Sequence, residues 1–566
     1  MTHEVFNAAA HLVDRQIERG HGARTAVIGP CGRVGYTELG RRVADSAAGW
    51  RAAGLRPEER VVLMAADGPD LLTALLSVIR AGAVAVPFPV MGTGGELAAA
   101  LRDSRARFLL VGPECARAAE EALTLLHPSS DLTAVVVLSD APVLPPGGVA
   151  RLRWEHLAAA GASGSPADGA ADRTTEDSPA LWLYTSGTAG APKAAMHRHG
   201  SLRHVAESFG RRVLGIGPED RCFSVAKLFF AYGLGNSCLL PLAAGAAVVL
   251  SPDRPTPTAI VRRLREDGPS VFFGVPTAYA ALLRAEDVPD DAFASVRLAV
   301  SAGEPLPSAL HRRFQERFGV ELIDALGSTE ALHVYLSNRP GSVRRGSVGT
   351  PVPGYRMRVL AEDGGPAGPG QAGLLEVNAP SAATGYWARS DLSRRVFRGE
   401  WLATGDVFTR GEDGSYTYLG RADDMIKSSG IWVSPTEVED QLLQHPCVHQ
   451  AAAVAIPDGD GLDRPVACVV AVPGQVVRTD ELIDFCRARL PSHKCPRRVI
   501  VFDALPSTGT GKIQRGRVRE QALRRLRDGT GCGRAPAPPH PAGPDAGPGP
   551  AAPRPDRAGT TGETHA

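Results

Sequence analysis

The chain has 566 residues, of which 43% are hydrophobic and 22% are charged, as in ordinary globular proteins. Its 62 Lys and Arg residues against 61 Asp and Glu leave a formal net charge of +1, which argues against a protein that lives on nucleic acid or on an anionic membrane. Nine cysteines are scattered without any C-x-x-C pair, so neither a zinc ribbon nor a disulfide framework is expected, and a reducing, cytoplasmic location is favoured. The first residues carry Glu4 and no apolar run, which is not typical of a secretory signal.

Short apolar runs alternate with helical patterns over the first 130 residues. The sequence predicts strands over 61–65, 83–87 and 108–111 and a helix over 70–80, an alternation that favours βαβ units and a largely parallel sheet. Residues 144–177 are rich in Pro, Gly, Ala and Ser and predict a solvent-exposed connection, apart from a short helical piece near Trp154.

The segment from Leu228 to Pro252 carries no charged residue and is long enough to span a bilayer. Its several glycines and Pro241 would break a spanning helix. We therefore expect buried strand and loop here and no membrane span.

The second half of the chain predicts three further units. Strand and helix signals continue past residue 299, and a β-rich subdomain is expected between 346 and 405. Strands over 448–456, 466–472 and 499–502 accompany a helix over 479–490, with Thr479 as its N-cap. The whole pattern predicts an α/β fold with a large N-terminal domain of parallel-sheet subdomains over 1–420 and a small α+β domain over 421–527. Residues 528–566 are rich in Pro, Gly and Ala and predict a disordered tail.

Lysine is rare, because only five of the 62 basic residues are lysine. Such a bias suggests that lysine has been replaced by arginine wherever either would serve, and a compact ammonium group in a tight site is where the two differ. The remaining lysines are therefore candidates for chemistry: Lys193, Lys227, Lys427, Lys494 and Lys512.

A strand over 181–185 leads into a loop dense in hydroxyls and glycines that ends at Lys193. Glycines let backbone N–H groups approach an anion closely, and hydroxyls and an ammonium add donors, so the loop suits a polyphosphate. It is not a Walker loop, because Pro192 precedes the lysine and Ala194 follows it. The alternative is a polar surface turn.

This loop resembles the phosphate loop of the adenylate-forming superfamily, which contains acyl-CoA synthetases, firefly-type luciferases and peptide-synthetase adenylation domains. Four more segments resemble that family's motifs, in the same order along the chain. They are Gly327-Ser-Thr-Glu330, Thr404-Gly-Asp406, the hinge motif from Gly420 to Gly430 and the lysine motif from Pro506 to Arg515.

Within the superfamily, residues 227–236 and 327–338 resemble benzoate-CoA ligases in particular. A pocket built from Phe229, Phe230, Ala231 and Tyr232, kept open by neighbouring glycines, suits a flat aromatic ring. No carboxylate lies in that stretch to hold an α-ammonium group, which argues against amino acids as substrates. Plain core packing is the alternative for either phenylalanine.

The resemblance implies a role for each matching residue. It implies ATP and AMP binding by Thr185, Ser186, Gly187, Thr188, Gly190, Lys193, Ser301, Ala302, Gly303, Glu304, Asp324, Thr329, Asp406 and Arg421. It implies an aryl pocket formed by Phe230, Ala231, Tyr232, Gly327 and His333, although a structural role for the histidine is an open alternative. It further implies that Glu330 holds Mg²⁺ and that Lys512 bridges the carboxylate and the α-phosphate.

The resemblance also implies a second half-reaction, in which the small C-terminal domain rotates about a hinge at Asp423. Lys427 would then replace Lys512 at the site, with Ser429 and Gly430 beside the pantetheine arm. The expected activity is an AMP-forming aryl-acid CoA ligase with ATP, Mg²⁺ and coenzyme A, and a homodimer is possible.

Two alternatives remain open at this point. One is transfer of the aryl group to the phosphopantetheine of a carrier protein. The other is nucleotide binding without catalysis, suggested by Ala189 and Ala194, which stand where the family usually has a hydroxyl residue and a glycine.

Overall fold

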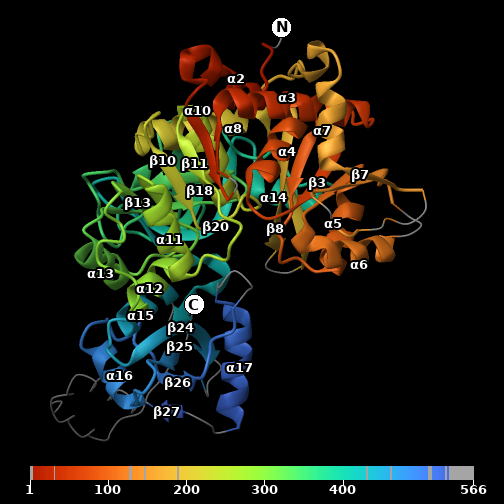
Figure 1. Cartoon of the computed structure of the whole chain (residues 1–566). Coiled ribbons are helices and arrows are strands. Elements are labelled where there is room, and N and C mark those ends of the chain that lie inside the picture. Colours follow the sequence, from red (N-terminus) through yellow and green to blue (C-terminus); the bar gives the residue numbers. More distant parts are fainter. Residues whose placement is uncertain are drawn as a thin grey trace, which may run out of the picture.

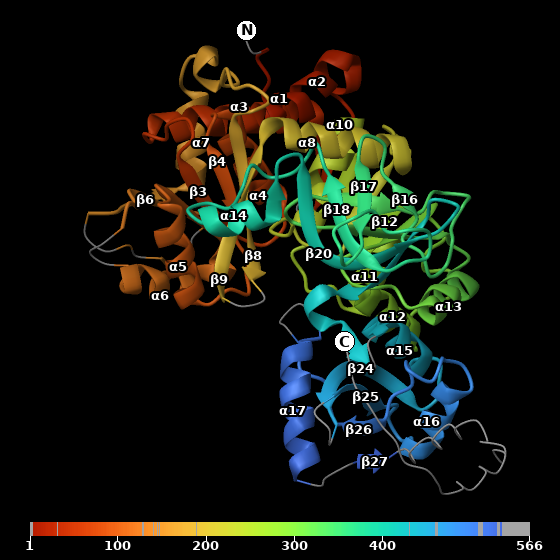
Figure 2. The same cartoon turned by 180° about the vertical axis from the view of Figure 1, so that it is seen from behind.

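The computed structural model describes residues 4–30, 32–126, 130–139, 141–143, 145, 148–187, 190–428, 431–458, 462–507, 513–528 and 532–534. Two large sheets and a five-stranded sheet form the upper body in Figures 1 and 2, and a small sheet with its helices lies below them. The structure confirms the predicted α/β class. Among the described residues, no helix is long and apolar enough to cross a membrane.

The first large sheet is parallel except for its last strand. Its order is β7 (Ala150–Arg153), β6 (Ala134–Val137), β5 (Phe108–Val111), β3 (Arg60–Met64), β4 (Val84–Pro87), β8 (Pro179–Gly187) and β9 (Gly190–Arg198). Side chains alternate between the faces: Val61 and Leu63 pack with α3 (Tyr36–Ala52) and α4 (Pro69–Arg80), whereas Val62 and Met64 pack with α5 (Gly94–Ser104) and α6 (Ala116–Leu126). The strands and the helix expected in this region are confirmed.

The predicted connection over 144–177 is more ordered than expected. It contributes the edge strand β7 and α7 (Trp154–Ala162), whose Trp154 and Leu157 are buried. A Cβ added at Gly49 of α3 would lie 2.1 Å from the carbonyl oxygen of Leu157, so the two helices pack with their backbones close together. The short helix expected near Trp154 is thus confirmed as α7, whereas the edge strand β7 was not expected.

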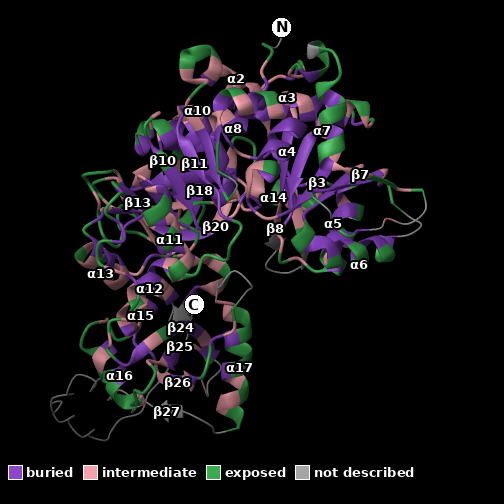
Figure 3. Ribbon diagram, viewed as in Figure 1, coloured by how far each residue is buried: buried purple, intermediate pink, exposed green. Residues whose placement is uncertain are grey.

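The second large sheet has a parallel centre with antiparallel strands at both ends. Its order is β16 (Thr350–Pro351), β15 (Val334–Ser337), β14 (Leu322–Gly327), β13 (Leu298–Ser301), β12 (Val271–Gly274), β10 (Arg221–Ser224), β11 (Ala247–Val249), β1 (Thr25–Gly29) and β2 (Gly32–Gly35). One face packs against α11 (Pro257–Asp267), α12 (Pro276–Arg284) and α13 (Ser308–Phe318). Buried residues are concentrated on the strands of both large sheets in Figure 3.

The uncharged segment from Leu228 to Pro252 is mainly helical, which corrects the expectation of strand and loop. It forms α9 (Ala231–Leu234), a π-helical turn over Gly235–Leu239, α10 (Leu240–Ala244) and then β11. Pro241 lies in the first turn of α10, where its missing N–H is tolerated. Gly233 allows its helix to pack against backbone, because an added Cβ would lie 2.0 Å from the carbonyl oxygen of Lys227.

The expected β-rich region forms a five-stranded sheet of β17 (Arg356–Leu360), β18 (Gly373–Asn378), β20 (Trp401–Arg410), β19 (Phe397–Arg398) and β21 (Tyr416–Arg421). The short helix α14 (Ser390–Val396) precedes β19. After β21 come a short 3₁₀ turn over Ala422–Asp424 and the hairpin of β22 (Ile426–Ser428) and β23 (Ile431–Val433).

The small sheet has the order β24 (Val448–Pro457), β25 (Asp463–Ala471), β26 (Arg498–Phe502) and β27 (Cys532–Arg534). Its faces pack against α15 (Pro435–Leu442) with α16 (Thr479–Arg487), and against α17 (Arg515–Arg527). In both views α15 lies beside α12 of the upper body. The domain limits at 420 and 527 stay a prediction.

Two details of this region differ from expectation. Thr479 is the first residue of α16 and not its N-cap, which is Arg478 and makes no capping hydrogen bond through its side chain. Residues 532–534 pair with β26, so the expectation of disorder from 528 onward does not hold for these three residues. The rest of the tail, 529–531 and 535–566, lies outside the described residues.

Candidate active site

The carboxyl ends of neighbouring parallel strands bring the first predicted residues together. Ser301 ends β13 and pairs in register with Asp324 of β14. Ser301 is buried and its hydroxyl has no hydrogen-bond partner among the described residues, and Gly303 follows with a φ of 89°. Burial raises the pKa of Asp324 well above its ordinary value, and the negative charge of Asp440 on α15 adds to the shift. This edge of an α/β sheet is where ligands usually bind.

The predicted phosphate loop is the tip of a β-hairpin. Thr185 of β8 pairs with Lys193 of β9, and Gly187 pairs with Gly190 closer to the tip. The loop between the two strands is therefore shorter than the predicted phosphate-loop motif, and Lys193 lies on strand β9. Ala194 is buried and is not among the non-glycine residues with positive φ, so the backbone after Lys193 accommodates an alanine. Thr188 and Ala189 lie outside the described residues, as does the side chain of Ser186.

Lys193 and Glu330 meet at Tyr386, a residue that the sequence did not single out. The Lys193 ammonium donates to the Tyr386 hydroxyl over 2.8 Å, and that hydroxyl donates to Glu330 Oε1 over 2.6 Å. Lys193 Nζ and Glu330 Oε1 are themselves 3.5 Å apart. A cation and a carboxylate thus stand side by side, next to the hairpin tip.

His197 supports the residue before Glu330. Its Nε2 lies 2.9 Å from the carbonyl oxygen of Thr329, and its side chain is almost fully buried. Burial lowers the pKa of His197 to about 4, so the ring is neutral at physiological pH and Nε2–H is the donor. The sequence did not identify this contact.

Asp406 and Arg421 form the predicted ribose pair on adjacent strands. Arg421 Nη1 donates to Asp406 Oδ1 and to the carbonyl oxygen of Thr404, both over 2.9 Å. Burial raises the pKa of Asp406 to about 6, although Arg421 opposes the shift, and the charge of Glu330 adds to it. The two carboxylates therefore lie within electrostatic range of each other. The hydroxyl of Tyr335, which is fully buried and has no partner among the described residues, lies in the same neighbourhood.

The predicted aryl-pocket residues gather around His333. Its ring stacks on Tyr232 with centroids 5.6 Å apart, and its Nε2 donates to the Tyr232 carbonyl over 3.3 Å. A Cβ added at Gly235 would lie 2.2 Å from His333 Cδ2, and one added at Gly327 would lie 2.3 Å from its carbonyl oxygen. The two glycines thus hold this histidine in a narrow space.

Electrostatics restrict what His333 can do. Burial lowers the pKa of His333 to about 4, so it carries no charge at neutral pH. Its Nδ1 has no partner among the described residues and is an acceptor, because Nε2 holds the proton. A neutral acceptor does not bind a carboxylate, and it can accept from a hydroxyl or amino substituent. Phe230 lies edge-on to the buried Phe229, and Ala231 begins α9.

The small C-terminal unit contributes fewer described site residues. Asp423 lies in the 3₁₀ turn before β22, and Lys427 lies on β22, with its side chain outside the described residues. Ser429, Gly430 and Lys512 also lie outside them.

The base of the Lys512 segment is nonetheless well defined. Ser507 and Ile513 pair as an isolated antiparallel bridge on either side of the segment. Two residues later, Arg515 donates to Glu439 of α15 over 2.6 Å and lies 3.8 Å from Asp424 beside the expected hinge.

The two other lysines make structural contacts. Lys227 Nζ donates to the carbonyl oxygen of Ser251 over 2.5 Å, and its charge lowers the otherwise raised pKa of the buried Asp67. Lys494 pairs with Glu437 over 2.7 Å. Of the three lysines whose side chains are described, only Lys193 lies among other predicted site residues. The rarity of lysine therefore does not by itself identify a site residue.

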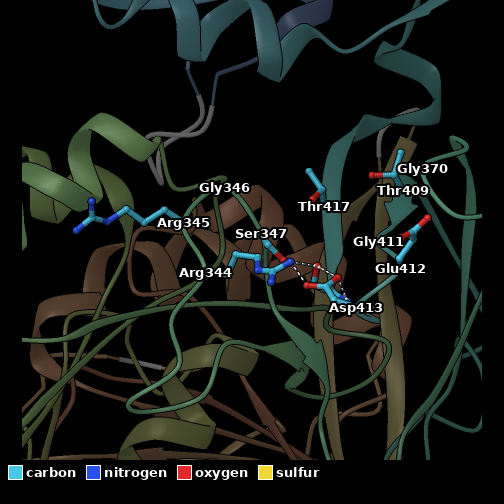
Figure 4. Close-up of a pocket in the computed structure, with 11 residues that line it drawn as sticks. Arg344, Arg345, Gly346, Ser347, Gly370, Thr409, Gly411, Glu412, Asp413 and Thr417 are labelled. Atoms are coloured by element: carbon cyan, nitrogen blue, oxygen red, sulfur yellow. Dashed lines mark hydrogen bonds and ion pairs between the residues drawn. The ribbon is translucent and has the colours of Figure 1, made fainter.

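A pocket of about 520 Å³ opens at the far ends of β20 and β21, away from the Asp406–Arg421 pair. Figure 4 shows its lining side chains, with Arg344 turned toward Asp413, with which it forms an ion pair. None of the predicted site residues lines it. Within the described part of the chain, no three His, Cys, Asp or Glu side chains cluster as a metal site.

Comparison with known proteins gives consistent matches along the chain. The family model of the AMP-binding enzymes matches residues 13–387, and that of the AMP-binding enzyme C-terminal domain matches residues 437–512. A benzoate–CoA ligase from Thauera aromatica is 42% identical over 532 residues, which cover 91% of this chain and 96% of that protein. A 4-hydroxybenzoate–CoA/benzoate–CoA ligase from Rhodopseudomonas palustris is 40% identical, with 92% and 94% covered.

Solved structures agree with these matches. An anthranilate CoA ligase in complex with anthranoyl-AMP superposes with a TM-score of 0.85 at 33% identity, covering 92% of this chain and 98% of that one. A benzoate CoA ligase from Burkholderia xenovorans LB400 gives a TM-score of 0.81 at 39% identity, with 91% and 100% covered. The chain therefore belongs to the AMP-binding enzyme family.

Proposed function

We propose that the chain is an ATP-dependent aryl-acid CoA ligase, an AMP-forming acid–thiol ligase that acts through an acyl-adenylate. The observation that carries the proposal is that two ion pairs lie near each other. Lys193 pairs with Glu330 and Arg421 pairs with Asp406, and the charge of Glu330 acts on the pKa of Asp406. The names of the similar proteins, benzoate–CoA ligases above all, support an aryl acid as the substrate.

In the first half-reaction, a carboxylate oxygen of the aryl acid attacks the α-phosphorus of ATP. The P–O bond to the β-phosphate breaks, and the products are the aryl-adenylate and pyrophosphate. Lys193 and the backbone N–H groups near Gly187 and Gly190 would stabilise the phosphate charge, which increases on the departing group. Asp406 would accept from the ribose hydroxyls, while Arg421 orients its carboxylate.

Glu330 is the proposed ligand of Mg²⁺. Its carboxylate is a hard oxygen donor beside the hairpin tip, and Mg²⁺ is commonly bound by one or two carboxylates together with substrate phosphates. When bound, Mg²⁺ would neutralise part of the phosphate charge. His197 would hold the adjacent carbonyl of Thr329 and so keep Glu330 in place.

The aryl ring is proposed to lie against Tyr232 and His333. The flat stacked pair suits a planar ligand. Because His333 is neutral, we assign the carboxylate of the substrate to Lys512, as the family resemblance implies, and not to the histidine.

In the second half-reaction, the thiol of coenzyme A attacks the carbonyl carbon of the adenylate. AMP leaves with the C–O bonding electrons, and the thiol proton is released. Rotation at Asp423 would withdraw Lys512 and bring Lys427 and the turn at Ser429 and Gly430 to the site. The names of the similar proteins favour coenzyme A as the acceptor. A carrier protein, a homodimer and a cytoplasmic location stay predictions.

The test is ATP–pyrophosphate exchange with a panel of benzoate and its hydroxy- and amino-substituted forms. We expect exchange that depends on at least one of these acids. Thioester formation would then be compared with free coenzyme A and with a holo carrier protein, and we expect coenzyme A to be the faster acceptor. Nucleotide binding without exchange for any acid on the panel would contradict the proposal and favour a binding protein.

A further inference from the structure

Tyr386 joins the two oppositely charged groups of the proposed phosphate site. Its hydroxyl accepts from Lys193 over 2.8 Å and donates to Glu330 Oε1 over 2.6 Å. The Lys193 ammonium also lies 4.1 Å from the centre of the Tyr386 ring, close enough for a cation–π contact. One side chain thus contacts the cation twice and the carboxylate once.

The surroundings of Tyr386 fix its position. It is 3% exposed, pairs with Ala195 of β9 as an antiparallel bridge, and packs with Ala195 and Ala383 in a small apolar cluster. Its backbone N–H donates to Ser393 Oγ over 2.9 Å, and its ring lies edge-on to Phe397. The side chain therefore holds its orientation without help from a ligand.

The direction of the hydrogen bonds follows from the groups involved. An ammonium group can only donate, so the tyrosine oxygen accepts from Lys193 and its own proton points to Glu330. Burial and the charge of Glu330 raise the pKa of Tyr386, so the hydroxyl keeps that proton at neutral pH. Both contacts of Glu330 involve Oε1, and within the described residues no hydrogen bond to Oε2 is found.

We propose that Tyr386 is a positioning residue for adenylation, which orients the Lys193 ammonium and the Glu330 carboxylate before MgATP binds. The inference rests on the proposed function of the site. It extends that function by assigning the residue to one half-reaction only. Thioester formation uses no pyrophosphate and should not need the contact.

The test is the variant Tyr386→Phe, which keeps the ring and removes the hydroxyl. A hydrogen bond to a charged group contributes enough that we expect kcat for exchange to fall on the order of 10- to 100-fold. The KM for the aryl acid should stay within about twofold, because the Tyr386 hydroxyl bonds Lys193 and Glu330 and not the predicted aryl-pocket residues. Calorimetric titration with ATP should require a higher Mg²⁺ concentration for the same affinity. Thioester formation from supplied benzoyl-adenylate and coenzyme A should match the parent.

Tyr36→Phe is the matched control. The Tyr36 hydroxyl is fully buried and donates to the carbonyl oxygen of Ala246 over 2.7 Å, in a part of the fold that contains no predicted site residue. This variant should lower the melting temperature without changing exchange. Equal losses in both half-reactions of Tyr386→Phe, or no loss in either, would overturn the proposal. If the parent shows no exchange with any acid, the proposed function fails, while the Mg²⁺ dependence of ATP binding still decides the role of Tyr386.

Discussion

Gly235 offers the sharpest test of the proposed aryl site. Its backbone φ of −57° is helical, so alanine is compatible with the backbone itself. The new Cβ would lie 2.2 Å from His333 Cδ2 and 2.3 Å from its Nε2, more than an ångström inside ordinary contact. The His333 ring must therefore move away from Gly235, and its stacking on Tyr232 must change.

The magnitude follows from that overlap. Overpacking a well-packed interior costs about 1–3 kcal/mol. If the displaced His333 ring moves into the space of the bound benzoate ring, this cost weakens benzoate binding. The KM for benzoate in the exchange assay should then rise by about 5- to 150-fold, since 1.4 kcal/mol is a factor of ten. The KM for ATP should change little, because the contacts of Lys193, Glu330 and Asp406 are separate from the histidine.

Gly49→Ala provides the control for overpacking elsewhere. Its Cβ would lie 2.1 Å from the carbonyl oxygen of Leu157, between α3 and α7, which hold no predicted site residue. Both variants should lose stability in thermal unfolding, but only Gly235→Ala should raise the KM for benzoate. An unchanged KM in a folded Gly235→Ala enzyme, or an equal rise in both variants, would refute the placement of the aryl ring beside His333.

Two further predictions concern charge. Lys512→Ala should abolish ATP–pyrophosphate exchange and leave ATP binding, whereas Lys427→Ala should leave that exchange and slow thioester formation. Loss of the same half-reaction in both variants would contradict the proposal that one lysine replaces the other at the site. Because the pKa of Asp406 is raised to about 6, its carboxylate is mostly ionised at pH 7 and mostly protonated at pH 5. Ribose binding needs the ionised form, so the KM for ATP should rise about tenfold as the pH falls from 7 to 5. Asp406→Asn should flatten this profile, and a profile unchanged by Asp406→Asn would show that another group titrates. His333, with a pKa of about 4, should not contribute.

Local patterns were sufficient for the strands that are buried on both faces. Runs such as 61–64 and 108–111 are apolar without interruption, as parallel strands between two helical layers must be. They failed for residues 228–252, where glycine and proline indicated loop. The structure uses those residues inside helices, since Gly233 and Gly235 permit close packing and Pro241 begins a turn.

The site shows a similar division. Lys193, Glu330, Asp406 and Arg421 carry their chemistry in their side chains and stand in recognisable motifs, so the sequence could name them as candidates, and their roles stay predictions. Tyr386 could not be found this way, because its role depends on a bridge to Ala195, 191 positions away in the chain.

One signal for His197 was available. On a strand, residues 193, 195 and 197 share one face, so recognising β9 as a strand would have placed His197 beside Lys193. In the structure, Ala195 packs with Tyr386 and His197 contacts the carbonyl oxygen of Thr329.

The most direct test of the central claim is a crystal structure with a non-hydrolysable benzoyl-adenylate analogue. We expect its ribose hydroxyls on Asp406, its phosphate mimic within reach of the β8–β9 hairpin, and its phenyl ring against Tyr232 and His333. An analogue bound with its ring outside this space, or with its ribose away from Asp406, would contradict the proposal that these residues form one adenylation site.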